Sequence, residues 1–128
     1  MLEVSLVTIC FIIQKCREFQ AKEEVVIPGG VDGSDEDWVA QVLADHADDW
    51  TVQEVRSAFD DLEPASQAQI VTLMWIGRGD FDASEWAEAE AEARAAWTPR
   101  TADYILATPL AADYLEYGLE ALGLECDE

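Results

Sequence analysis

The sequence predicts an all-α protein: a single compact domain of about six or seven helices around a buried central helix at about residues 64–77. Residues 70–76 are apolar at six of seven positions, and a helix that is apolar on all sides must be covered on all sides. Elsewhere, apolar residues recur at three- and four-residue steps. Capping residues, Pro and Gly separate these segments, and no segment is convincing as a strand.

The length of 128 residues predicts one domain, residues 1–128. A chain of this size buries about two thirds of its unfolded surface, which is enough for a core without metal or disulfides.

The first half of the chain predicts three helices. Ser5 can cap a helix over about 6–22 with a wide apolar face, which suits either a deep core position or a dimer interface. A Gly-rich loop is expected at 25–35, and Ser34 can cap a second helix that ends near residue 47. Thr51 with Glu54 forms a capping-box pattern for a third helix.

The second half begins with the central helix, in which Pro64 occupies the first turn and Gly77 or Gly79 can end it. A buried strand is the rival interpretation of residues 70–76, but residues 65–69 lead into them without a break and favour a helix. Asp82 with Glu85 predicts the cap of a fifth helix.

Two Thr-Pro pairs predict the last two helices. Thr98-Pro99 should start a helix over about 99–106, and Thr108-Pro109 one over about 109–122. Gly123 should end the last helix, leaving residues 124–128 as a frayed tail.

Acidic residues dominate the charge: 28 Asp and Glu against seven Lys and Arg give a net charge of −21. Such a chain repels phosphate backbones and anionic lipids, so we expect no direct nucleic-acid binding and no membrane binding. Solubility, halophilic adaptation and recognition of a basic partner all fit this charge.

The three cysteines, Cys10, Cys16 and Cys126, are an odd number and form no CxxC motif; Cys10 and Cys16 lie in the apolar first helix and are expected to be buried thiols. Reduced thiols suit the cytoplasm. The apolar run near the N-terminus has no basic leader region and is too short to span a bilayer.

The sole histidine, His46, lies among carboxylates. On a helix His46, Asp45 and Asp49 could share a face and hold a divalent cation. The alternative is a structural role for an exposed histidine near a helix C-terminus.

A second candidate is the corner formed by Arg78, Asp80 and Asp82, directly after the central helix. The structural alternative is a helix stop, a turn and the next cap, with Arg78 paired to Asp80 or another carboxylate.

No set of nucleophile, base and orienting group is visible, and no cofactor fingerprint occurs, so we expect no cofactor. Carboxylates alone remain as acid–base groups, and pairs of them are unavoidable in this composition.

Four segments resemble a family of small bacterial proteins known only as a domain of unknown function: MLEVS with FIIQKCREF, ADHADD, MWIGRGDFDASEW and RTADYILATPLAADYLEYGLEALG. The stretches WIGRGD and TPLxxDYLExGL are the most specific, and the resemblance extends over nearly the whole chain. It implies a compact helical domain of bacterial origin and brings no catalytic or binding residues.

The first functional hypothesis is therefore a cytoplasmic, non-enzymatic protein-interaction or regulatory protein that binds a basic protein. A small carboxylate- or metal-dependent enzyme and a nucleic-acid mimic that blocks a basic groove are the alternatives. A homodimer is also compatible with the first helix.

Overall fold

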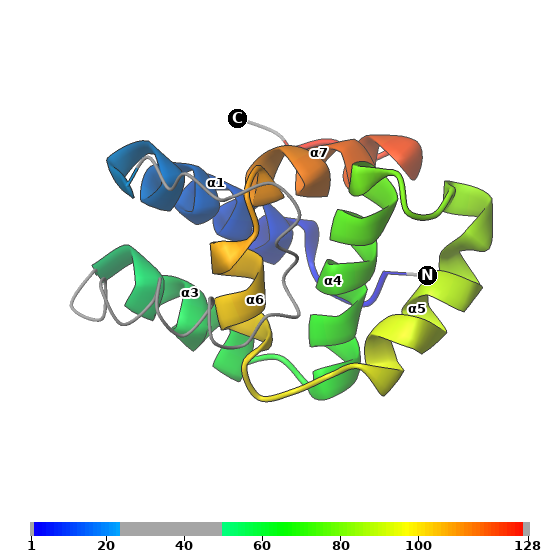
Figure 1. Ribbon diagram of the computed structural model, residues 1–128, viewed down its shortest axis with the longest axis horizontal. Helices are drawn as coiled ribbons and strands as arrows, with labels where there is room; N and C mark the ends of the chain where they lie inside the picture. Colours follow the sequence, from blue (N-terminus) through cyan, green and yellow to red (C-terminus); the bar gives the residue numbers. More distant parts are fainter. Residues whose placement is uncertain (1, 24–49, 127–128) are drawn as a thin grey trace.

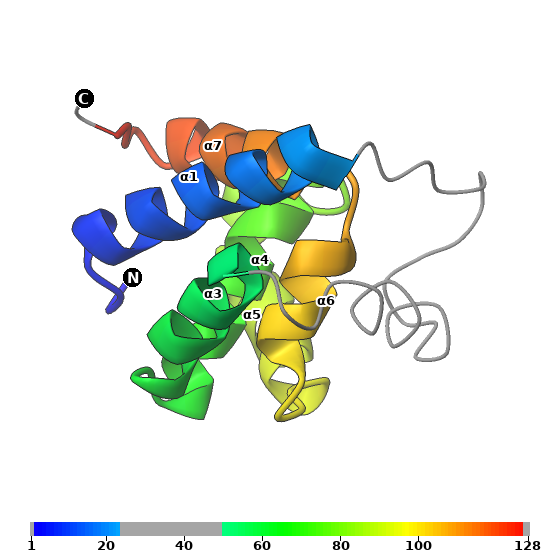
Figure 2. The same cartoon turned by 90° about the vertical axis from the view of Figure 1, so that its left-hand side faces the viewer.

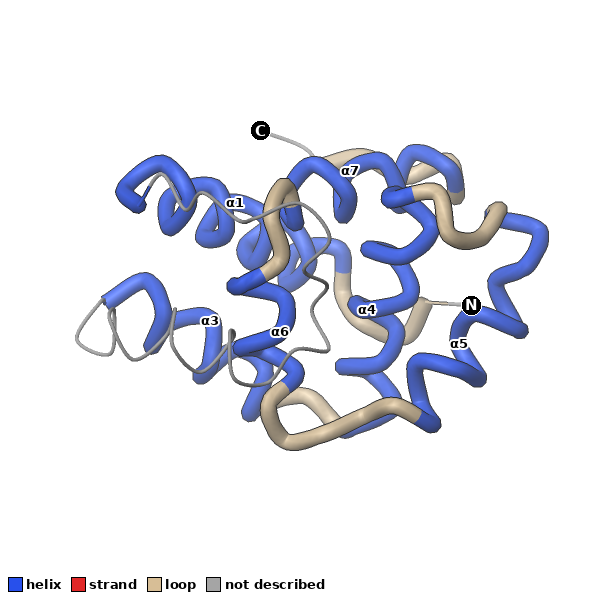
Figure 3. The backbone as a smooth tube through the Cα atoms, viewed as in Figure 1, coloured by secondary structure: helices blue, strands red, loops and turns tan. Residues whose placement is uncertain are grey.

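The computed structural model describes residues 2–23 and 50–126, which form helices joined by turns and loops (Figures 1 and 3). Its helices are α1 (Leu6–Glu23), α3 (Trp50–Asp60), α4 (Pro64–Arg78), a 3-10 turn η1 (Ala83–Glu85), α5 (Trp86–Ala95), α6 (Thr101–Ala107) and α7 (Ala111–Ala121). The described residues contain no strand, which confirms the all-α prediction. The expected loop at 25–35 and the expected helix at 34–47 lie outside the described residues.

Helix α4 is the centre of the fold, as predicted. Residues 67–74 are all buried, and α7, α5 and α6 pack around the helix (Figure 1). Pro64 lies in its first turn, where the missing N–H needs no partner. Gly79 ends it in the left-handed conformation, with φ 97°, so the second of the two predicted glycine stops is the correct one.

Helices α1 and α7 lie side by side over one end of the bundle, and α3 and α6 extend below them (Figure 2). The buried side chains of α1 include Ile9, Ile12 and Phe19, so its wide apolar face serves the core. The Ser5 cap is confirmed: the backbone N–H of Thr8 donates to Ser5 Oγ at 3.2 Å.

Two glycines allow α4 and α7 to approach closely. A Cβ atom on Gly77 would lie 1.7 Å from the carbonyl oxygen of Tyr114, and one on Gly118 would lie 2.2 Å from the carbonyl oxygen of Leu73. The backbones of α4 and α7 are therefore in direct contact. Gly77 lies within α4 and packs against α7, and it does not end the helix.

A buried glutamine joins three elements around the start of α4. Gln67 Nε2 donates to the carbonyls of Phe59 at 2.9 Å and Leu62 at 3.1 Å. Gln67 Oε1 accepts a hydrogen bond from Trp97 Nε1 at 2.8 Å. This side chain therefore satisfies carbonyls at the end of α3 and holds the loop before α6.

Three predicted helix starts were wrong. Thr51 lies inside α3 and is buried, so it does not cap that helix. Helix α6 begins at Thr101, two residues after Pro99. Thr108 closes α6, because its hydroxyl donates to the carbonyl of Tyr104 at 2.7 Å.

Helix α7 consequently begins only at Ala111, after Leu110 in the left-handed region with φ 59°. Gln20 of α1 holds this connection, since its Nε2 donates to the Thr108 carbonyl and its Oε1 accepts the N–H of Leu110. The hydrogen bonds from Gln20 of α1, rather than the local Thr-Pro signal, decide where α7 starts.

Candidate functional site

The corner after α4 consists of three charged side chains with partners inside the protein. Arg78 Nε donates to Asp80 Oδ2 at 2.8 Å, and Arg78 Nη2 lies 2.6 Å from the same oxygen. The predicted Arg78–Asp80 pair is therefore confirmed. Partial burial lowers the pKa of Arg78, but hydrogen bonds and charge from Asp80 and Tyr104 outweigh it and leave that pKa above its ordinary value.

Asp82 acts as a cap, in the capping box predicted from the sequence. Its side chain accepts from the backbone of Glu85, and its own N–H donates to Glu85 Oε1 at 2.8 Å. The geometry at this corner corresponds to the structural alternative of a helix stop, a turn and the next cap.

Aromatic side chains support the same corner. Trp75 Nε1 donates to Tyr104 Oη at 2.9 Å, and the rings of Trp75 and Phe81 stack with centroids 6.1 Å apart. This packing connects the end of α4 to α6 and to the following turn.

The metal-site candidates His46, Asp45 and Asp49 lie outside the described residues. Within residues 2–23 and 50–126, no group of three or more His, Cys, Asp or Glu side chains is arranged to hold a metal ion.

A groove between α1 and α3 is a feature that the sequence analysis missed. Its volume is about 490 Å³, and it is lined by Phe11 of α1 and by Trp50, Gln53, Glu54, Ser57, Ala58 and Asp61 along α3 and its C-terminal end. The α3 residues recur at three- and four-residue steps, so they form one face beside the buried Val52–Val55–Phe59 stripe. This second three- and four-residue periodicity in α3 was the sequence signal from which the groove face could have been predicted.

Lys15 lies beside this groove and is paired with two carboxylates. Lys15 Nζ lies 3.5 Å from Glu18 Oε2, 3.3 Å from Glu54 Oε1 and 5.5 Å from the centre of the Phe11 ring. Desolvation lowers the pKa of Lys15, but the two carboxylates outweigh it and raise that pKa above its ordinary value. Lys15 thus joins α1 to α3 at the edge of the groove.

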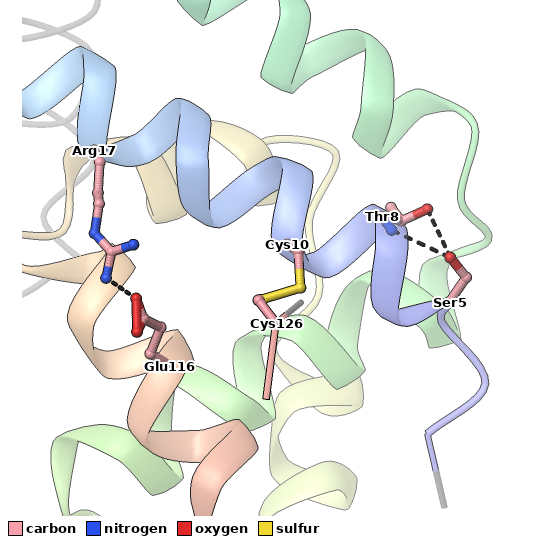
Figure 4. Close-up of a disulfide and its surroundings, with 6 residues drawn as sticks. All are labelled: Ser5, Thr8, Cys10, Arg17, Glu116 and Cys126. Atoms are coloured by element: carbon pink, nitrogen blue, oxygen red, sulfur yellow. Dashed lines mark hydrogen bonds and ion pairs between the residues drawn. A yellow bond between two sulfur atoms is a disulfide. The ribbon is translucent and has the colours of Figure 1, made fainter. Parts of the chain in front are cut away.

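The cysteines differ from the prediction. Cys10 forms a disulfide with Cys126, across 116 positions of sequence, so the expectation of a buried Cys10 thiol was wrong (Figure 4). The bond attaches residues 124–126, which belong to the tail expected to be frayed, to α1. Nearby, Arg17 forms an ion pair with Glu116 of α7 (Figure 4).

Cys16 is the free cysteine and is fully buried, as predicted. Burial raises the pKa of its thiol to about 12 from an ordinary 9.0. The folded protein therefore keeps the Cys16 proton in a pH range where the unfolded chain releases it.

This difference predicts an alkaline loss of stability. Below about pH 9 the Cys16 contribution is complete, and it is lost as pH rises from about 9 towards 12, because the unfolded state then binds fewer protons. Urea unfolding across this range should show a steeper decline for the wild type than for Cys16→Val, which has no thiol. Parallel curves for the two proteins would contradict the burial of this thiol.

The profile of a protein family described as a protein of unknown function, DUF3775, matches residues 52–124, which is more than half of the chain. The chain belongs to the DUF3775 family. This confirms the resemblance to a domain of unknown function. The DUF3775 match excludes α1 and ADHADD, so it is shorter than the resemblance implied.

No curated protein and no solved structure matches the chain. The DUF3775 description names no activity, ligand or site residue to transfer. Within the described part of the chain, none of the helices has the length and apolar character to cross a membrane.

Proposed function

We propose that this DUF3775 member is a non-enzymatic, acidic protein-interaction or regulatory protein whose partner is a basic protein. The observation that supports it most is that the described Lys and Arg side chains are largely paired with carboxylates of the same chain. In the described part of the chain, five Lys and Arg side chains lie within 4.0 Å of a carboxylate: Lys15, Arg17, Arg56, Arg78 and Arg94. Because the chain has 28 acidic residues and only seven Lys and Arg, such pairs leave an excess of negative charge that attracts a cationic partner.

The alternatives have less support. At the Arg78 corner the charged groups bind one another and the backbone, which suits a structural role better than acid–base chemistry. A nucleic-acid mimic is compatible with the negative charge, whereas the wide apolar face of α1, on which the homodimer was based, serves the core of the same chain.

The disulfide bears on the compartment. Disulfides persist in oxidising environments and are rare in a reduced cytoplasm, so the Cys10–Cys126 bond favours an oxidising compartment over the cytoplasm expected from the sequence.

A labelled peptide of about 18 residues, rich in Lys, tests the proposed function against the same peptide with Glu at every Lys position. Fluorescence anisotropy should show that the Lys peptide binds and still binds at physiological ionic strength, where simple surface attraction is screened beyond about 8 Å. We expect no binding of the Glu peptide. Equal binding of the two peptides, or no binding of either, would overturn the proposal.

A further inference from the structure

We infer that the groove between α1 and α3 is the docking site for a basic amphipathic helix of the partner protein. This inference rests on the proposed function and assigns it a place on the molecule. It is carried by the shape of the groove, the exposure of its aromatic residues and the sign of its charge.

The shape suits a helix lying lengthwise. The groove residues of α3 and of the turn after it run from Trp50 to Asp61, which at 1.5 Å per residue is a length of about 16 Å, or three helical turns. Amphipathic helices bind such grooves through apolar side chains spaced three and four residues apart.

The aromatic residues supply the apolar contact. Trp50 is 72% exposed and Phe11 is 37% exposed, and both line the groove; Val7, one turn before Phe11 on α1, is 81% exposed. Trp is the residue type that most often carries the binding energy of a protein interface. Trp50 and Phe11, both exposed in the same groove, therefore give the apolar face of a partner helix its anchors.

The charge of the groove selects a cationic occupant. Glu54 and Asp61 line the groove. Beside the groove, Lys15 is already paired with Glu18 and with Glu54. Among the described residues that line the groove there is no Lys or Arg. Lys or Arg residues on a partner helix would complement this excess.

The same charge disfavours two other occupants. A second copy of the chain would bring another net charge of −21 against the groove. The chain's own residues 24–49 contain eight acidic residues and no Lys or Arg, so they cannot complement the carboxylates either.

The experiment uses the full-length protein and a labelled Leu/Lys peptide of about 18 residues, with Leu at i, i+3, i+4 and i+7 positions. A peptide of the same composition in scrambled order removes the apolar stripe. Trp50→Ala and Asp61→Asn alter the groove. The matched controls are Tyr117→Ala, at an aromatic side chain that is 54% exposed on α7, and Glu120→Gln, at an exposed carboxylate of the same helix.

We expect Trp50→Ala to raise the Kd of the amphipathic peptide about tenfold or more, and Asp61→Asn to raise it several-fold and weaken its salt dependence. Tyr117→Ala and Glu120→Gln should stay within about twofold of the wild type. The scrambled peptide should bind clearly more weakly than the amphipathic one.

Equal losses for Trp50→Ala and Tyr117→Ala, or equal binding of both peptide orders, would overturn the docking site while leaving a general preference for basic partners intact. Failure of every Lys-containing peptide to bind would instead remove the proposed function itself.

Two further measurements identify a different occupant. A dimer in sedimentation equilibrium that Trp50→Ala converts to a monomer would assign the groove to a second copy. A large fall in the melting temperature of Trp50→Ala would assign it to the chain's own residues. Either result would overturn the inference; a monomer with an unchanged melting temperature supports it.

Discussion

Gly77→Ala is expected to destabilise the protein by about 3 kcal/mol or more. Helix propensity alone predicts the opposite, because alanine in a helix interior is about 1 kcal/mol more favourable than glycine. The tertiary contact decides the sign: the added Cβ would meet the carbonyl oxygen of Tyr114 at 1.7 Å and the backbone nitrogen of Gly118 at 2.9 Å. Because both obstacles are backbone atoms of α7, the two helices would have to move apart.

Urea unfolding followed by circular dichroism measures this effect. Ala91→Gly is the matched control, since Ala91 is exposed in the middle of α5 and should lose only about 1 kcal/mol through propensity. Loss of folding in Gly77→Ala fits the expectation, whereas stability equal to or above that of the wild type would show that α4 and α7 are not in backbone contact.

Reduction of the Cys10–Cys126 disulfide should cost about 4 kcal/mol of stability, the second large effect. A cross-link between positions 116 residues apart removes much of the unfolded chain's freedom, and the chain-entropy estimate for a loop of about 100 residues is about 4.7 kcal/mol. The melting temperature should fall by roughly 10 °C or more on addition of a reductant.

The double variant Cys10→Ser/Cys126→Ser provides the control. It should melt near the temperature of the reduced wild type and should not respond to reductant. Thiol titration of the unfolded, unreduced wild type should find one thiol, Cys16, and reduction should add two. Three thiols before reduction would refute the bond.

Local signals predicted the elements whose ends depend on near neighbours. Pro64 starts α4, the Asp82–Glu85 pair caps the turn before α5, and each involves residues within one helical turn. The enclosed position of α4 also followed from its own composition, because an apolar surface on all sides leaves no face for water.

The candidate site depends on contacts that local signals do not contain. The Arg78–Asp80 pair was predictable because its members are two residues apart, whereas the groove requires Phe11 to lie beside a face of α3 some 40 to 50 positions later in the chain. The Thr108 prediction was wrong for a related reason: Gln20, 88 residues earlier, holds the turn before α7.

The sequence by itself determined the helical class, the buried α4 and the strong negative charge, because each follows from composition and from spacing within a few residues. Only the tertiary structure decided that Cys10 meets Cys126, that Gly77 and Gly118 bring two backbones together, and that α1 and α3 leave a groove with an acidic edge. These are contacts between distant segments, and their partners are set by how the helices cross.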